Sequence, residues 1–85
     1  MKITPLQHLL CIQNKPLREV RQAIGVTRAV LWRWKLGRAF PNQLNMQKLI
    51  EFYGPDRLDY NGCFIASVEI TDEQARVYGL NHAEG

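Results

Sequence analysis

The sequence predicts a compact, mainly α-helical domain of four to five short helices, with a short C-terminal β-hairpin or strand as an optional addition. Apolar residues recur at helical spacing over most of the first 54 positions. Helix-capping residues precede these segments, and glycines follow them. Hydrophobic residues make up 46% of the 85 residues, which is typical of one globular domain with a modest core.

The first helix is expected to begin after Thr4 and to end near Asn14. Thr4 is a good N-cap, and Pro5 suits the first helical position because its missing N–H would be unpaired there anyway. Gln7 completes a Thr-x-x-Gln capping box. The apolar face of this helix is expected to comprise Leu6, Leu9, Leu10 and, as a further candidate, Ile3.

The next two predicted helices are joined by a turn at Gly25. Pro16 lies in the first turn of the second helix, whose apolar face comprises Leu17, Val20 and Ile24. Gly25 ends this helix, since glycine adopts the left-handed conformation without steric cost. Val26 is expected to point into the core, and Thr27 to cap a third helix from about Arg28 to Leu36.

The third and fourth helices each show an apolar stripe. In the third helix the stripe comprises Val30, Leu31 and Trp34, so Trp34 is expected to lie in the core. Asn42 is the expected cap of a fourth helix from about Gln43 to Tyr53, which Gly54 and Pro55 end. The expected apolar face of the fourth helix comprises Leu44, Leu49, Ile50 and Tyr53, with Met46 beside it.

Residues 55–85 are interpreted as an extension of the helical domain formed by residues 1–54. Asn61 and Gly62 form an Asn-Gly pair, which is a strong signal for a β-hairpin. Apolar residues then alternate over residues 64–70, as in a half-buried strand. A second capping box over residues 71–74 predicts a short final helix. Its apolar residues are Ala75, Val77 and Tyr78, and Gly79 is expected to end it.

Charge is divided unevenly along the chain. Residues 1–50 carry nine Lys and Arg against one Glu, whereas residues 51–85 carry two Arg against seven Asp and Glu. A strongly basic segment favours a polyanionic partner. Residues 1–50 are therefore expected to bind a polyanion, and the acidic residues 51–85 are expected to have a different role.

The sequence argues against several other functions. Its apolar runs are too short for a transmembrane helix or a signal peptide, so no membrane association is expected. Cys11 and Cys63 match no metal or redox spacing and are expected to be free thiols in a reducing cytosol. With no glycine-rich phosphate loop, nucleophile elbow or metal cluster, we expect no enzyme activity, cofactor, metal site or small-molecule ligand.

Residues 17–53 resemble the helix-turn-helix of the phage Cro/CI repressor (XRE-type) family. The most specific part of the match is the turn Ile24-Gly25-Val26-Thr27. The following helix matches through Leu31-Trp32-Arg33-Trp34-Lys35-Leu36-Gly37-Arg38, with Pro41 three residues on. Two residues depart from the pattern. Arg21 stands where the family usually has a small residue, so it must bend outward or widen the helix pair, and Trp32 replaces a small polar residue. For Arg21 two roles stay open, a phosphate contact or an ion-pair partner of Glu19 or of the C-terminal acids.

The resemblance implies a repressor-like helix-turn-helix fold whose third helix enters the DNA major groove. The positions that align with base contacts are Arg28, Ala29, Trp32 and Arg33. The positions that align with phosphate contacts are Thr27, Lys35, Arg38, Asn42 and Arg18. For Trp32 an alternative remains, in which its ring packs against Phe40.

The function that the resemblance implies is a sequence-specific transcriptional regulator, foremost a phage or prophage Cro-like repressor on a palindromic operator. Such a regulator is expected to be a homodimer, and residues 55–70 are the candidate dimerisation element because an exposed strand edge can pair across a two-fold axis. Two alternatives stay open. One is an antitoxin-type protein that binds a toxin partner and its own promoter, and the other is an RNA-binding module.

Overall fold

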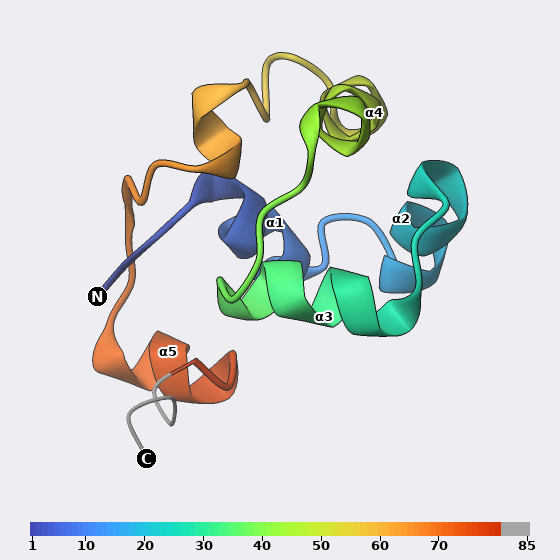
Figure 1. Cartoon of the computed structure of the whole chain (residues 1–85). Coiled ribbons are helices and arrows are strands. Elements are labelled where there is room, and N and C mark those ends of the chain that lie inside the picture. The colour runs from blue at the N-terminus through green and yellow to red at the C-terminus, as the bar shows by residue number, and fades with distance from the viewer. Residues whose placement is uncertain (81–85) are drawn as a thin grey trace.

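The computed structural model describes residues 1–80 and confirms a mainly helical, compact fold (Figure 1). Four helices of eight to eleven residues are followed by a short 3₁₀ turn and a six-residue helix. In chain order the elements are β1 (Lys2–Ile3), α1 (Pro5–Ile12), α2 (Leu17–Ile24), α3 (Arg28–Leu36), α4 (Gln43–Tyr53), η1 (Asn61–Cys63), β2 (Val68–Glu69) and α5 (Asp72–Val77). The predicted extension reaches residue 85, and its last five residues lie outside the described part.

Helix α1 begins as the sequence predicts. The Thr4 hydroxyl accepts from the Gln7 backbone N–H at 3.0 Å, and the Gln7 side chain accepts from the Thr4 N–H at 3.1 Å. Gln7 also donates from Nε2 to the Lys35 carbonyl at 3.3 Å, so this buried side chain ties the start of α1 to the end of α3. The same residue therefore caps one helix and satisfies a terminal carbonyl of another.

The main core lies where α1 packs against α3 and α2 packs against α4. Its fully buried side chains include Leu10, Val20 and Leu49, and Trp34 is 3% exposed, which confirms its predicted place in the core. Val26 packs against this core from the turn, as expected. The apolar stripe of each helix thus sets its orientation, and the polar side of α3 is left facing solvent.

Two predicted core positions are wrong. Leu44 is 59% exposed and Met46 takes its place in the core at 2%, because α4 buries the face that Met46, Leu49 and Tyr53 share. In α5, Val77 is 76% exposed, whereas Ala75 is buried. In both helices the apolar residues cover more than one face, so spacing alone did not decide which face packs inward.

The predicted hairpin at Asn61 and Gly62 is also wrong. The structure has a 3₁₀ turn there, and the Gly62 N–H donates to the Asp59 carboxylate at 2.7 Å. Gly62 is buried against α1, where an added Cβ would lie 3.2 Å from the Cβ of Pro5. Burial of Leu58 and Cys63 in the main core holds this segment against α1, so it cannot project as a hairpin.

The predicted strand over residues 64–70 is reduced to Val68–Glu69 and pairs with an element that the sequence did not reveal. β2 runs antiparallel to β1, with Lys2 opposite Glu69 and Ile3 opposite Val68. Ile3 is therefore not part of the first helix face, but packs in a second cluster with Ile70, Ala75 and Leu80. The N-terminal ammonium, 2.9 Å from the Glu69 carboxylate, adds an ion pair to this end of the sheet.

Gly37→Ala is expected to destabilise the fold more than Gly25→Ala. Both glycines have a positive φ, +75° and +82°, which costs a residue with a Cβ about 1–2 kcal/mol. An alanine Cβ at position 37 would also lie 2.7 Å from the Gln7 Nε2, whereas the one at position 25 meets no atom within 4 Å. Displacing Gln7 breaks its bond to Lys35, so we expect a loss of about 2–3 kcal/mol for Gly37→Ala.

Urea denaturation of both alanine variants measures this difference. Equal losses for the two variants would show that the Gln7 contact adds nothing to the backbone cost.

Stability is expected to fall at alkaline pH. Burial raises the pKa of the Tyr53 hydroxyl from 10.0 to about 12, and burial together with the Asp59 carboxylate raises the pKa of the Cys63 thiol from 9.0 to about 11. The folded state then holds two protons that the unfolded chain releases. Their contribution to stability is complete below pH 9 and is lost as the pH rises through 11 and 12.

The free energy of unfolding at about pH 8 and at about pH 11 checks this expectation. Tyr53→Phe is the matched variant, since it removes one of the two titrations, along with a buried hydroxyl that has no hydrogen-bond partner among the described residues. Its stability should depend less on pH above pH 10 than that of the native chain, and an identical dependence would contradict the assignment.

Candidate nucleic-acid interface

Helix α3 presents one exposed side that is free of contacts with the core. Arg28, Ala29, Trp32 and Arg33 are all exposed, while Leu31 and Trp34 on the opposite side are buried. This division follows from the helical period, because positions three and four apart share a face. The four residues expected at base-contact positions thus lie together on the solvent side of α3.

The start of α3 is set by local hydrogen bonds. The Thr27 hydroxyl accepts from the Val30 N–H at 3.3 Å, which caps the helix directly after the Gly25 turn. Thr27 is exposed, as is required of a phosphate contact, although its hydroxyl already serves the cap. The turn and the cap together fix the direction in which the exposed side of α3 points.

The other expected phosphate contacts surround α3. Arg18 is exposed near the start of α2, and Arg38 is exposed just after the Gly37 turn that ends α3. Asn42 caps α4 through its side-chain oxygen, which accepts from the Asn45 N–H at 2.8 Å, so only its amide NH₂ remains available. Lys35 is half-buried, and its ammonium lies 4.4 Å from the centroid of the Trp32 ring.

Trp32 does not pair with Phe40. Among the described residues, the aromatic neighbour of Phe40 is Phe64, with ring centroids 5.8 Å apart, and Phe64 in turn lies 5.6 Å from Tyr60. The Trp32 side chain is 48% exposed and its ring is covered on one side by the Lys35 ammonium. The ring therefore has apolar surface to offer a ligand, which the packing alternative would have removed.

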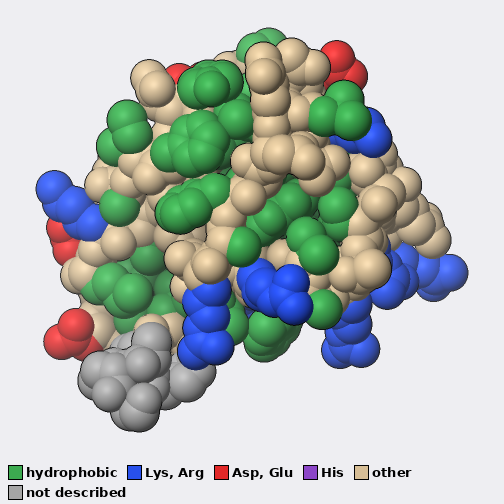
Figure 2. Space-filling model, viewed as in Figure 1, with side chains coloured by type: hydrophobic (Ala, Val, Ile, Leu, Met, Phe, Trp, Pro, Cys, Tyr) green, Lys and Arg blue, Asp and Glu red, His purple; other side chains and the backbone are tan. Residues whose placement is uncertain are grey.

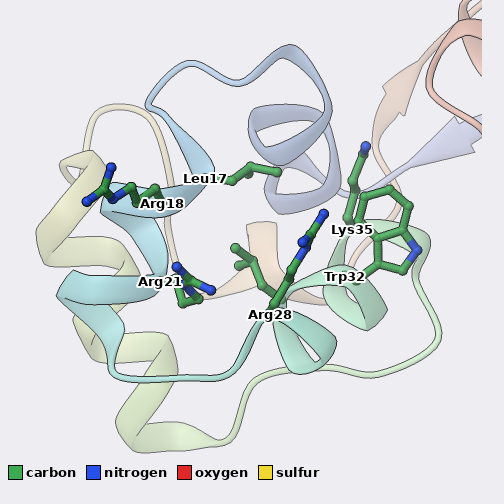
Figure 3. Close-up of a pocket in the computed structure, with 7 residues that line it drawn as sticks. Leu17, Arg18, Arg21, Arg28, Trp32 and Lys35 are labelled. Atoms are coloured by element: carbon green, nitrogen blue, oxygen red, sulfur yellow. The ribbon is translucent and has the colours of Figure 1, made fainter.

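A hollow of about 290 Å³ separates α2 from α3 (Figure 3). Its lining comes from these two helices: Leu17, Arg18 and Arg21 of α2, and Arg28, Leu31, Trp32 and Lys35 of α3. Figure 3 shows Arg21 and Arg28 extending into the space between the helices, with Arg18 at its outer edge. Four of the seven lining side chains are cationic, and none is acidic.

The sequence left two roles open for Arg21, a phosphate contact or an ion-pair partner, and the structure places it in the lining of this hollow. The expectation that its large side chain bends outward or widens the helix pair matches the hollow beside it. The signal was present in the sequence as the departure from a small residue, but the spacing of motifs does not show where a long side chain goes. The partners suggested by the sequence, Glu19 and the C-terminal acids, form no ion pair with it among the described residues, where the single ion pair joins Met1 to Glu69.

Cationic side chains dominate the α2–α3 side of the molecule. Figure 2 shows Lys and Arg along the lower and right-hand edges of this face, where α3 and α2 lie in Figure 1, and hydrophobic side chains gathered above them. Because the described residues supply no ion-pair partner to these cations, the potential there is set by unpaired positive charge.

No protein-family model, curated protein or solved structure matches the chain. Within residues 1–80, every helix is too short or too polar to cross a lipid bilayer.

Proposed function

We propose that this protein is a sequence-specific DNA-binding transcriptional regulator, most simply a phage or prophage Cro-like repressor of the bacterial cytoplasm or nucleoid. The observation that carries the proposal is the exposed side of α3, where Arg28, Ala29, Trp32 and Arg33 lie together behind the Gly25 turn and the Thr27 cap. A helix presented in this way fits the major groove of B-DNA.

The proposed contacts are of two kinds, contacts with bases and contacts with phosphates. The planar fork of an arginine such as Arg33 can pair with the O6 and N7 of guanine, and the methyl of Ala29 can touch a thymine methyl. Cations at the rim, such as Arg38 and Arg18, bind phosphates, which positions the protein without specifying sequence. Repression would follow from occupying the operator and excluding polymerase.

A dimer would double this contact across a palindromic operator, with half-sites about one helical turn, ~34 Å, apart. Within the proposed dimerisation element of residues 55–70, Tyr60, Phe64 and Ile65 are 58%, 40% and 54% exposed. Phe40 extends this apolar patch toward the end of α3. Exposed aromatic side chains gathered in one patch favour burial against a second copy of the chain.

Binding to three nucleic acids of one mixed sequence tests the proposed partner. The probes are a DNA duplex of about 21 base pairs, two helical turns, the RNA duplex, and the single DNA strand. We expect the DNA duplex to bind most tightly, because the A-form major groove is too narrow to admit α3. Equal or tighter binding of the RNA duplex or of the single strand would replace the proposal with the RNA-binding alternative.

Sedimentation equilibrium tests the dimer. Phe64→Lys places a charge in the proposed interface, and Val77→Lys is the control, because Val77 is an exposed apolar residue outside the patch at 76% exposure. The native chain and the control are expected to sediment as dimers, and Phe64→Lys as a monomer. A dimeric Phe64→Lys protein would place the interface elsewhere.

A further inference from the structure

The hollow between α2 and α3 concentrates positive charge that the described part of the chain does not balance. Arg21, Arg28 and Lys35 line it together with Arg18, and no carboxylate lies among the lining residues. Several cations around one hollow give it a positive potential, which attracts anions. This unbalanced charge indicates that the hollow binds an anionic group.

The lining of the hollow also indicates what kind of anion it binds. Leu17 and Leu31 form an apolar surface between the cationic groups, and the Trp32 ring stands at the edge with Lys35 over one face. A phosphate attached to a sugar matches this pattern, because guanidinium forks bind phosphate oxygens bidentately and the sugar carbons can contact the apolar wall. At about 290 Å³ the hollow lies at the lower end of the sizes seen for small-molecule pockets, which is enough for one sugar-phosphate unit.

The position of the hollow indicates the source of that phosphate. Arg28 and Trp32 belong both to the lining of the hollow and to the exposed side of α3. A duplex held against α3 would therefore have its backbone beside the opening. We propose that the hollow is a phosphate-binding site occupied by a backbone phosphate of bound duplex DNA, with Arg21 and Arg28 as its principal ligands. This inference rests on the proposed function.

One consequence is a change in which residues of α3 contact bases and which contact phosphates. Figure 3 shows the Arg28 side chain directed into the hollow, so Arg28 binds phosphate, and base readout rests on Ala29 and Arg33 one turn apart. Arg21 becomes a DNA ligand that the family resemblance does not supply, because the small residue usual at that position cannot reach a phosphate.

The test measures the salt dependence of DNA binding for Arg21→Gln and Arg28→Gln in the full chain, with a mixed-sequence duplex as the probe. The slope of log K against log salt is negative, and each variant is expected to reduce its magnitude by about 0.9, as for the loss of one phosphate contact. Arg57→Gln is the matched control, since Arg57 is an exposed arginine outside the hollow, and its slope should equal that of the native chain. Circular dichroism melting of each variant verifies that it is folded.

Inorganic phosphate distinguishes the two possible sources of the anion. Thermal midpoints of the free protein are compared in sodium phosphate and in sodium chloride at matched ionic strength. Unchanged slopes in both glutamine variants, with the native chain binding duplex DNA, would overturn this inference and leave the proposed function standing. Unchanged slopes together with a phosphate-raised midpoint that Arg21→Gln abolishes would assign the hollow to a free phosphorylated molecule instead. Failure of the native chain to bind any duplex would overturn both proposals.

Discussion

Trp34→Ala is expected to lower the free energy of unfolding by about 3–5 kcal/mol, the range for truncating a large buried aromatic side chain. Trp34 is 3% exposed and packs in the main core, where its loss leaves a cavity that the surrounding helices cannot fill. A domain of this size has about 4–13 kcal/mol of total stability, so the loss is a large share of it, and the melting temperature of the variant should lie well below that of the native chain. Thermal melting followed by circular dichroism measures the effect.

Trp32→Ala is the matched control on the same helix. Its side chain is 48% exposed, so removing it costs the contact with Lys35 and far less buried surface than removing Trp34, which is 3% exposed. We expect its free energy of unfolding to stay within about 1 kcal/mol of that of the native chain. Similar destabilisation by the two substitutions would contradict the assignment of Trp34 to the core and of Trp32 to the solvent side.

Arg33→Ala is expected to weaken binding to a selected operator by about tenfold to a hundredfold, or 1–3 kcal/mol, because it removes a bidentate contact with a base. Binding to mixed-sequence DNA should change much less. The Arg33 side chain lies on the exposed side of α3 and lines no part of the hollow, so its loss leaves the proposed phosphate site intact. Fluorescence anisotropy with both duplexes at one salt concentration gives the two affinities.

Arg33→Lys sharpens this test. Lysine keeps the positive charge but cannot form the two parallel hydrogen bonds of a guanidinium, so specificity should fall even though the charge remains. Equal losses on operator and mixed-sequence DNA in Arg33→Ala would show that Arg33 contacts the backbone and not a base.

The sequence predicted the helices well because local residues fix them. Thr4 and Gln7 form the expected capping box, and Thr27 and Asn42 cap the helices that follow them. Gly25 and Gly37 both adopt the left-handed conformation that ends a helix. Each of these interactions spans only a few residues, so the pattern in the chain carries almost all the information needed.

Elements that depend on distant contacts were not predicted. β2 lies inside the strand predicted over residues 64–70, but its partner β1 was missed, because β1 comprises only Lys2 and Ile3 and two residues are too few to show a strand pattern. The Asn61-Gly62 pair would suit a hairpin in isolation, but burial of Leu58 and Cys63 against α1 decides its conformation. In such segments tertiary packing overrides the local preference.

In the candidate site, too, the features set by local sequence were predicted and those set by tertiary packing were not. The helical period was sufficient to place Ala29 and Arg33 on the exposed side of α3 and Trp34 on the buried one. The hollow beside Arg21 could not be located from the sequence, since it depends on the separation of two helices and on the direction of long side chains. Motif spacing carries no information about either quantity.

Selection of bound sequences from a random duplex DNA pool tests the central claim most directly. The purified 85-residue protein is incubated with the pool at moderate salt, and the retained duplexes are sequenced over successive rounds. Sequence-specific binding by a symmetric dimer predicts enrichment of one inverted repeat, with half-site centres about 10–10.5 base pairs apart. Retention of bulk DNA without any enriched sequence, or no retention at all, would contradict the claim.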